Sequence, residues 1–147
     1  MWRGALRAPL CLCSSESASL PSTGTYNFDG PPLAVDVITA AMPNLQGQAA
    51  LKMPARSAAW RDTCTLRIRA VLNAARSQRC ETLVLGAFGC GAFGNPPDDV
   101  ADLFQACLRS DEFRGCFRLI VFAILEFKSS DTGNFAAFAD ALASLCK

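Results

Sequence analysis

Three stretches of the chain have the pattern of a helix. From Ala58 to about Ser77, apolar side chains recur at spacings of three and four residues, which places them on one helical face. That face consists of Cys64, Ile68, Val71, Leu72 and Ala75. A second helix is predicted from Pro97, because a proline followed by two aspartates suits a helix N-terminus. A third is predicted over Gly133–Lys147.

Three apolar runs predict strands, one before the first of these helices and two between the helices. Leu33–Leu45 is rich in β-branched residues and stops at a Pro-Asn pair. Glu81–Phe88 is expected to be a buried strand. Cys116–Phe127 is continuously apolar, as expected for a strand covered on both faces. The alternation of strands and helices predicts an α/β layered domain with largely parallel strands.

Composition and charge narrow the class of protein. With 147 residues, 51% of them hydrophobic and 18% charged, the chain is expected to form one globular domain. A net charge of +1 gives no basic face for nucleic acid, and the apolar runs are shorter than the roughly 20 residues of a membrane span. We therefore expect no direct nucleic-acid partner, no membrane segment, and an intracellular protein of the cytoplasm or nucleus. Residues 1–27 are expected to be a disordered leader, whose Ser and Ala content leaves organellar import open.

The chain has eight cysteines and no histidine. Without histidine, neither a Ser-His-Asp triad nor a Cys-His nucleophile can be built. Most of the cysteines lie in apolar helix or strand patterns and none forms a C-x-x-C pair, so we expect reduced thiols, no metal site and no cofactor.

Five arginines line the other side of the first predicted helix, namely Arg61, Arg67, Arg69, Arg76 and Arg79. Such a stripe could bind an anion, but a solvated outer face is the favoured interpretation.

The sequence GCGAFGN links the strand Glu81–Phe88 to the helix from Pro97. Glycines let a ligand approach the backbone closely, and successive N–H groups beside a helix N-terminus suit an anion. Ligands of open α/β sheets also bind beyond the carboxyl ends of strands. We therefore expect a phosphate-bearing ligand at Gly89–Asn95. The loop lacks the lysine of a Walker A motif, and its literal match to G-x-G-x-x-G is weak, so a simple tight turn remains the alternative.

The segments LVLGAFGCGAFGNPPDDVADLF, VDVITAAMPNL and FRLIVFAIL followed by NFAAFADAL resemble the microbial-type poly(ADP-ribose) glycohydrolase family. The resemblance covers roughly Pro32 to Leu142. It implies an α/β fold, specifically a three-layer α/β/α macrodomain-like fold with a mixed, largely parallel sheet. That domain would occupy residues 28–147 and would be truncated at its N-terminus relative to the family.

The resemblance also implies a ligand and the residues that bind it. In the family, the backbone amides of this loop wrap the diphosphate of ADP-ribose, and an aromatic side chain, here Phe93, packs on a ribose. The implied binding residues are Gly89, Cys90, Gly91, Ala92, Phe93, Gly94 and Asn95. Asn44 is a weaker candidate, because a role in turning the chain after Pro43 explains it equally well. The implied partner is ADP-ribose or a poly(ADP-ribose)-modified protein.

The catalytic loop of the family has no counterpart in this sequence. Family members use a glycine run followed by QEE, in which a glutamate acts as general acid on the glycosidic oxygen. This chain contains no Gly-Gly or Glu-Glu pair. We therefore expect no catalytic residue here and no turnover. The chain would be a fragment or decayed relative of an enzyme, with two alternatives: a non-catalytic ADP-ribose-binding module, or an α/β interaction domain without a ligand.

Overall fold

The computed structural model describes residues 6–10, 33–48, 51, 53–124 and 133–145. The chain forms two compact units, Met1–Thr39 and Ala40–Lys147. In the first unit, β1 (Leu6–Leu10) pairs antiparallel with β2 (Leu33–Val37). The strand predicted to reach Leu45 therefore ends at Val37. Residues 38–45 have no regular structure, because a proline and an Asx turn follow and the segment hydrogen-bonds to the glycine loop instead of a strand.

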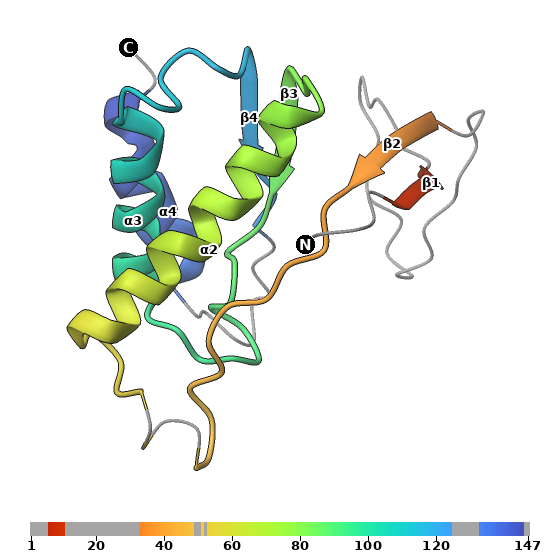
Figure 1. Cartoon of the computed structure of the whole chain (residues 1–147). Coiled ribbons are helices and arrows are strands. Elements are labelled where there is room, and N and C mark those ends of the chain that lie inside the picture. The colour runs from red at the N-terminus through yellow and green to blue at the C-terminus, as the bar shows by residue number, and fades with distance from the viewer. Residues whose placement is uncertain (1–5, 11–32, 49–50, 52, 125–132, 146–147) are drawn as a thin grey trace, which may run out of the picture. The chain divides into compact units, whose positions relative to one another are not determined.

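Among its described residues, the second unit shows the helices α2, α3 and α4 and a parallel pair of strands (Figure 1). In chain order these are α2 (Ala58–Ser77), β3 (Thr82–Leu85), α3 (Pro97–Arg109), β4 (Leu119–Phe122) and α4 (Asn134–Leu142), followed by the short 3-10 helix η1 (Ala143–Leu145). Since α3 is the crossover between β3 and β4, the strands run parallel, with Thr82 opposite Leu119. The predicted α/β class and parallel strands are confirmed.

The two long helices begin where the sequence predicts. At the start of α2, the Ser57 hydroxyl accepts a hydrogen bond from the Trp60 amide, at 3.2 Å. At the start of α3, Pro97 occupies the first turn together with Asp98 and Asp99. The buried face of α2 consists of Trp60, Cys64, Ile68, Leu72 and Ala75, so the predicted face is confirmed except that Val71 is only half-buried.

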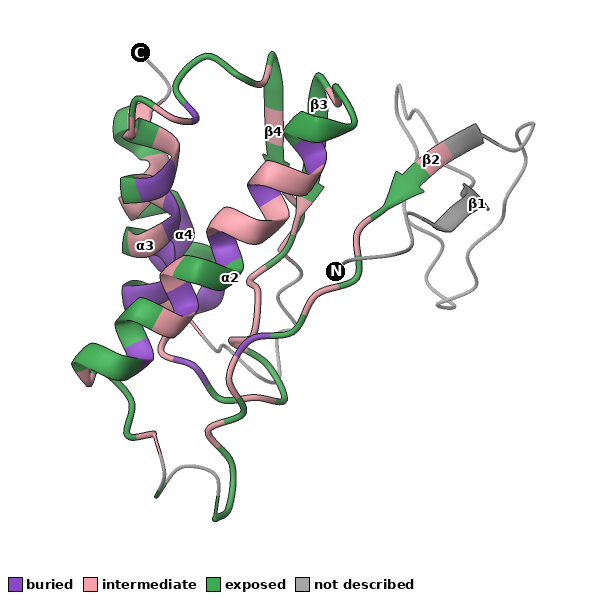
Figure 2. Cartoon of the chain, in the orientation of Figure 1, coloured by how far each residue is buried: buried purple, intermediate pink, exposed green. Residues whose placement is uncertain are grey.

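The core of the second unit is an aromatic cluster that joins α3, β4 and α4. The ring centroid of Phe104 lies 5.3 Å from that of Phe122 and 6.1 Å from that of Phe138, and the last two rings are 5.4 Å apart. Figure 2 shows the buried residues on the faces that these helices turn toward one another. Edge-on and tilted contacts of this kind stabilise a core beyond the area that they bury.

The paired strands are not covered on both faces, so that prediction is wrong. Leu83 on β3 is buried, but the neighbouring Val84 is 60% exposed, and Leu119 and Val121 on β4 are 48% and 41% exposed. Alternate residues of a strand point to opposite faces, and these three apolar side chains share one face. A continuous run of apolar residues does not reveal whether one face of a strand or both are covered, so the sequence could not distinguish these two cases. β4 covers only part of the strand predicted over Cys116–Phe127: residues 116–118 and 123–124 have no regular structure, and 125–127 lie outside the described residues.

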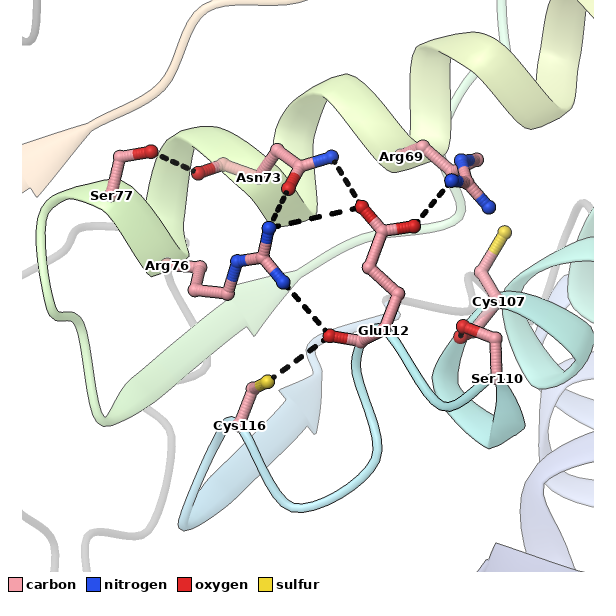
Figure 3. Close-up of polar contacts among 8 residues, drawn as sticks. All are labelled: Arg69, Asn73, Arg76, Ser77, Cys107, Ser110, Glu112 and Cys116. Atoms are coloured by element: carbon pink, nitrogen blue, oxygen red, sulfur yellow. Dashed lines mark hydrogen bonds and ion pairs between the residues drawn. The ribbon is translucent and has the colours of Figure 1, made fainter.

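Four of the five arginines of the predicted stripe are exposed, as expected of a solvated outer face, and three of the five also form ion pairs. Arg61 lies 2.6 Å from Asp99, and Arg69 and Arg76 both pair with Glu112. Glu112 follows α3, and its carboxylate also accepts a hydrogen bond from Asn73 at 3.0 Å (Figure 3).

The backbone of Glu112 strengthens this junction between α2 and the segment after α3. Its carbonyl accepts a hydrogen bond from Arg76 at 2.9 Å and a weaker one from the Cys116 thiol at 3.3 Å (Figure 3). The guanidiniums of Arg69 and Arg76 also lie over the ring of Phe113, at 5.9 and 5.5 Å from its centroid.

Replacing this carboxylate tests how much the junction stabilises the fold. We expect Glu112→Gln to lower the free energy of unfolding by about 1–2 kcal/mol, because two half-exposed ion pairs weaken while part of the hydrogen bonding survives. Thermal denaturation followed by circular dichroism measures the loss. Asp111→Asn is the control, since the Asp111 carboxylate is fully exposed and, among the described residues, its ion-pair partner is Arg114 at 3.5 Å. Equal effects of the two substitutions would contradict this account.

Candidate functional site

The GCGAFGN loop lies beyond the carboxyl end of β3 and leads into α3. Three hydrogen bonds within it and to the end of the strand fold it into tight turns. The Cys90 amide donates to the Ala87 carbonyl at 3.0 Å, the Gly94 amide to Gly91 at 2.9 Å, and the Asn95 amide to Gly89 at 3.1 Å. The loop is therefore built by its own backbone at the edge where α/β sheets bind ligands.

Four other amides of the loop have no such partner. The N–H groups of Gly89, Gly91, Ala92 and Phe93 donate to no group in the part of the chain that the structure describes. Gly91 and Ala92 are exposed, and Phe93 is half-buried. Backbone donors of this kind are normally paired with protein or water, so a run of them in a turn suits an anion.

The three glycines of the loop serve different purposes. Gly89 and Gly94 have positive φ angles, +80° and +67°, which other residues rarely adopt. A Cβ at Gly89 would also collide with Met42, and one at Gly94 with the amide nitrogen of Gln46. Gly91 differs, because its φ is not positive and a Cβ there would have no atom within 4 Å. Gly89 is thus required by its backbone conformation and by the buried Met42, and Gly94 by its backbone conformation, whereas Gly91 faces open space.

Asn95 holds the loop in place. Its side chain is 2% exposed, and its Nδ2 donates to the carbonyls of Pro43 and Gly89, both at 2.9 Å. Its Oδ1 accepts a hydrogen bond from the indole Nε1 of Trp60 at 2.8 Å. The side chain thereby ties the loop to α2 and to the segment before α2, and its amide hydrogens are not available to a ligand.

The segment 42–46 forms one side of the loop. The Leu45 amide donates to the Phe93 carbonyl at 2.8 Å, so Asn44 lies next to the predicted binding residues. The exposed Asn44 accepts the Gln46 amide at 2.9 Å through its Oδ1, which is the turn-forming role that the sequence left open. Its Nδ2 has no partner among the described residues.

The charge at the start of α3 is balanced by two arginines. Asp99 lies at the N-terminus of α3, a position that favours a negative charge. Its carboxylate is 2.5 Å from the Nε of Arg56 and 2.6 Å from Arg61, and these two ion pairs balance that charge. Arg56 itself has a φ of 64°, a conformation uncommon outside glycine. Neither this pair nor the contact of Trp60 with Asn95 could be predicted, because no sequence spacing links residues about forty positions apart.

The surroundings of Cys90 disfavour its thiolate form. Burial, and then the neighbouring Cys64 thiol, raise the pKa of Cys90 to about 12. The thiol therefore stays protonated at neutral pH, and the Cys90 amide is already bonded to Ala87. Cys90 contributes to the loop through its backbone shape.

The described residues contain no group of three or more His, Cys, Asp or Glu side chains that could hold a metal ion. Among the helices in the described ranges, none has the length and apolar character required to cross a membrane. The five described cysteines, Cys64, Cys80, Cys90, Cys107 and Cys116, are free thiols.

Comparison with known proteins identifies the relatives of this chain through structure. No family model and no curated protein matches the sequence. Poly(ADP-ribose) glycohydrolase from Deinococcus radiodurans in complex with ADP-ribose matches 79% of this chain, with a TM-score of 0.69 and 36% identity. The enzyme from Thermomonospora curvata matches 76% of it, with a TM-score of 0.66 and 34% identity.

The match covers only part of each relative. The chain spans 46% of the Deinococcus enzyme and 39% of the Thermomonospora enzyme. The apo form of the Deinococcus enzyme gives the same result, with a TM-score of 0.69 at 37% identity. The resemblance of this chain to the microbial-type poly(ADP-ribose) glycohydrolase family, predicted from its sequence, is confirmed.

Proposed function

We propose that this chain binds ADP-ribose through the GCGAFGN loop and does not cleave it. The observation that carries the proposal is the set of loop amides without a protein partner at the carboxyl end of a parallel strand. The similarity to an enzyme captured with ADP-ribose supports the choice of ligand. A diphosphate carries the anionic oxygens that such donors bind.

In the proposed complex, the amides of Gly91, Ala92 and Phe93 donate to the diphosphate. The half-buried Phe93 ring packs on a ribose, and Asn44 at the rim offers its free amide hydrogens. Asn95 acts indirectly, because it fixes the loop that presents these donors. The loop carries no charged side chain, so recognition depends on backbone shape rather than on a cation.

The partner is free ADP-ribose or a poly(ADP-ribose)-modified protein. We infer that it is met inside the cell, in the cytoplasm or nucleus, where cysteines such as the free thiols of this chain stay reduced. Residues 28–147 would act as the macrodomain-like part of the chain.

Calorimetric titration with ADP-ribose tests the binding. We expect saturable binding of ADP-ribose at the loop, and no binding of adenosine, which lacks the diphosphate. If a folded protein gives no heat with ADP-ribose over the concentrations that saturate the Deinococcus enzyme, the alternative of an α/β interaction domain without a ligand replaces this proposal.

The absence of catalysis is tested separately. These 147 residues contain neither a glycine run nor a Glu-Glu pair, and the carboxylate of Glu112 is held by two arginines away from the loop segment. Because the sequence lacks the family's general-acid motif, we infer that no general acid protonates the leaving oxygen. We expect no release of ADP-ribose from its polymer by the purified chain, with the Deinococcus enzyme as positive control. Release that disappears in Gly91→Glu would show that the chain is an enzyme.

A further inference from the structure

A hollow lies at the other end of α3 from the glycine loop. Its volume is about 490 Å³, which is within the range of roughly 300–1,000 Å³ typical of small-molecule sites. Apolar walls come from Phe117, Ile120 and Leu145. Its polar side chains are Arg109, Arg114 and Ser144, and no carboxylate of a described residue lines it.

The polar side chains of the hollow form a set of donors. The Ser144 hydroxyl oxygen accepts hydrogen bonds from Arg109 at 2.6 Å and from Gln105 at 3.2 Å. Because both lone pairs are then used, its hydrogen is left to donate, and no acceptor for it lies among the described residues. Among the described residues, the Arg109 guanidinium pairs with no carboxylate. The carboxylate of Asp111, two residues further along the chain, pairs with Arg114 instead.

The hollow thus combines an anion site with an apolar surface. Arg114 is held at the helix end by hydrogen bonds to the Arg109 carbonyl, at 3.0 and 3.4 Å, which leaves its Nη1 available. Guanidinium groups and a hydroxyl suit a phosphate, and Phe117 with the aliphatic walls suits a planar base.

We propose that this hollow binds a nucleoside phosphate group and serves as a second subsite for an ADP-ribose polymer. This identification of the polymer rests on the proposed function of the loop. The two sites lie at opposite ends of α3, whose 13 residues span about 20 Å. One polymer carries repeated base and phosphate groups, so it can occupy both sites, whereas a monomer occupies one at a time.

Occupation of two sites by one molecule raises the affinity through effective concentration. We expect a short ADP-ribose polymer to bind the full-length chain at least about tenfold more tightly than the monomer. Arg109→Gln removes the guanidinium, and Ser144→Ala removes the hydroxyl donor but keeps the charge. Both substitutions should lower the affinity of the chain for the polymer toward its affinity for the monomer. Neither should change the affinity for the monomer. Arg67→Gln is the matched control, because Arg67 is an exposed arginine of α2 that does not line the hollow.

Fluorescence anisotropy with labelled monomer and polymer measures these affinities. Equal affinities of the wild-type chain for the two ligands would overturn the second subsite while leaving the loop site intact. The second subsite would also be overturned if Arg109→Gln and Ser144→Ala left the ratio of polymer affinity to monomer affinity unchanged.

A titration with AMP, followed by amide NMR, examines the hollow without relying on the loop. Shifts at Gly115, Phe117 and Ser144 that are lost in Arg109→Gln support the site even if ADP-ribose does not bind the loop. The absence of shifts at these residues would overturn the proposal.

Discussion

Gly91→Glu is expected to weaken ADP-ribose binding at least about 100-fold, a loss of roughly 2.7 kcal/mol of binding free energy. The new carboxylate would occupy the space in front of the loop amides and repel the diphosphate. The fold should tolerate it, because Gly91 is exposed, has no positive φ, and would meet no atom within 4 Å of an added Cβ. We therefore expect an unchanged melting temperature. Calorimetry and thermal denaturation of the same sample measure both effects.

Two further substitutions at this position separate charge from size. Gly91→Ala adds only a methyl group and should keep binding within a few-fold of the wild type. Gly91→Gln has the size of the glutamate without its charge, and we expect an intermediate loss. If Gly91→Glu binds as tightly as Gly91→Ala, the diphosphate does not lie at this loop.

Asn95→Ala is expected to lower the free energy of unfolding by about 2–4 kcal/mol. It removes three hydrogen bonds and leaves the buried Nε1 of Trp60 without an acceptor. The carbonyl oxygens of Pro43 and Gly89 lose a donor as well. Since these bonds also hold the loop against its neighbours, ADP-ribose binding should fall although no direct contact is removed. Urea denaturation gives the stability, and calorimetry gives the affinity.

Two controls show whether the loss comes from this hydrogen-bond network. Trp60→Phe removes one of the three bonds and should cost less than Asn95→Ala in stability. Asn134→Ala removes another buried asparagine, whose Oδ1 has no hydrogen-bond partner among the described residues, and should also cost less. A loss in Asn134→Ala equal to that in Asn95→Ala would mean that the cost reflects a buried asparagine in general.

The helices could be predicted from the sequence because local rules determine them. The apolar spacing on α2 and the proline and acids at the start of α3 are visible within one or two turns. The strands were harder. Apolar residues of β4 lie on both of its faces, and only the packing decides that Leu119 and Val121 stay exposed.

The candidate site shows the same division between local and distant information. Glycines before a helix indicate a loop that can approach an anion, and that much is visible in the sequence. The separate roles of Gly89 and Gly91 follow from Met42, which lies far away along the chain. Likewise, the sequence placed Asn95 among the ligand contacts, whereas its side chain is engaged by Trp60 and Pro43.

Amide NMR of the chain during titration with ADP-ribose tests the central claim most directly. The largest downfield shifts are expected at the N–H groups of Gly91, Ala92 and Phe93, which have no partner among the described residues. Cys90 and Gly94, whose amides already donate within or beside the loop, should shift less. Shifts confined to residues outside the loop, or equal shifts on addition of adenosine, would contradict the claim that these amides bind the diphosphate.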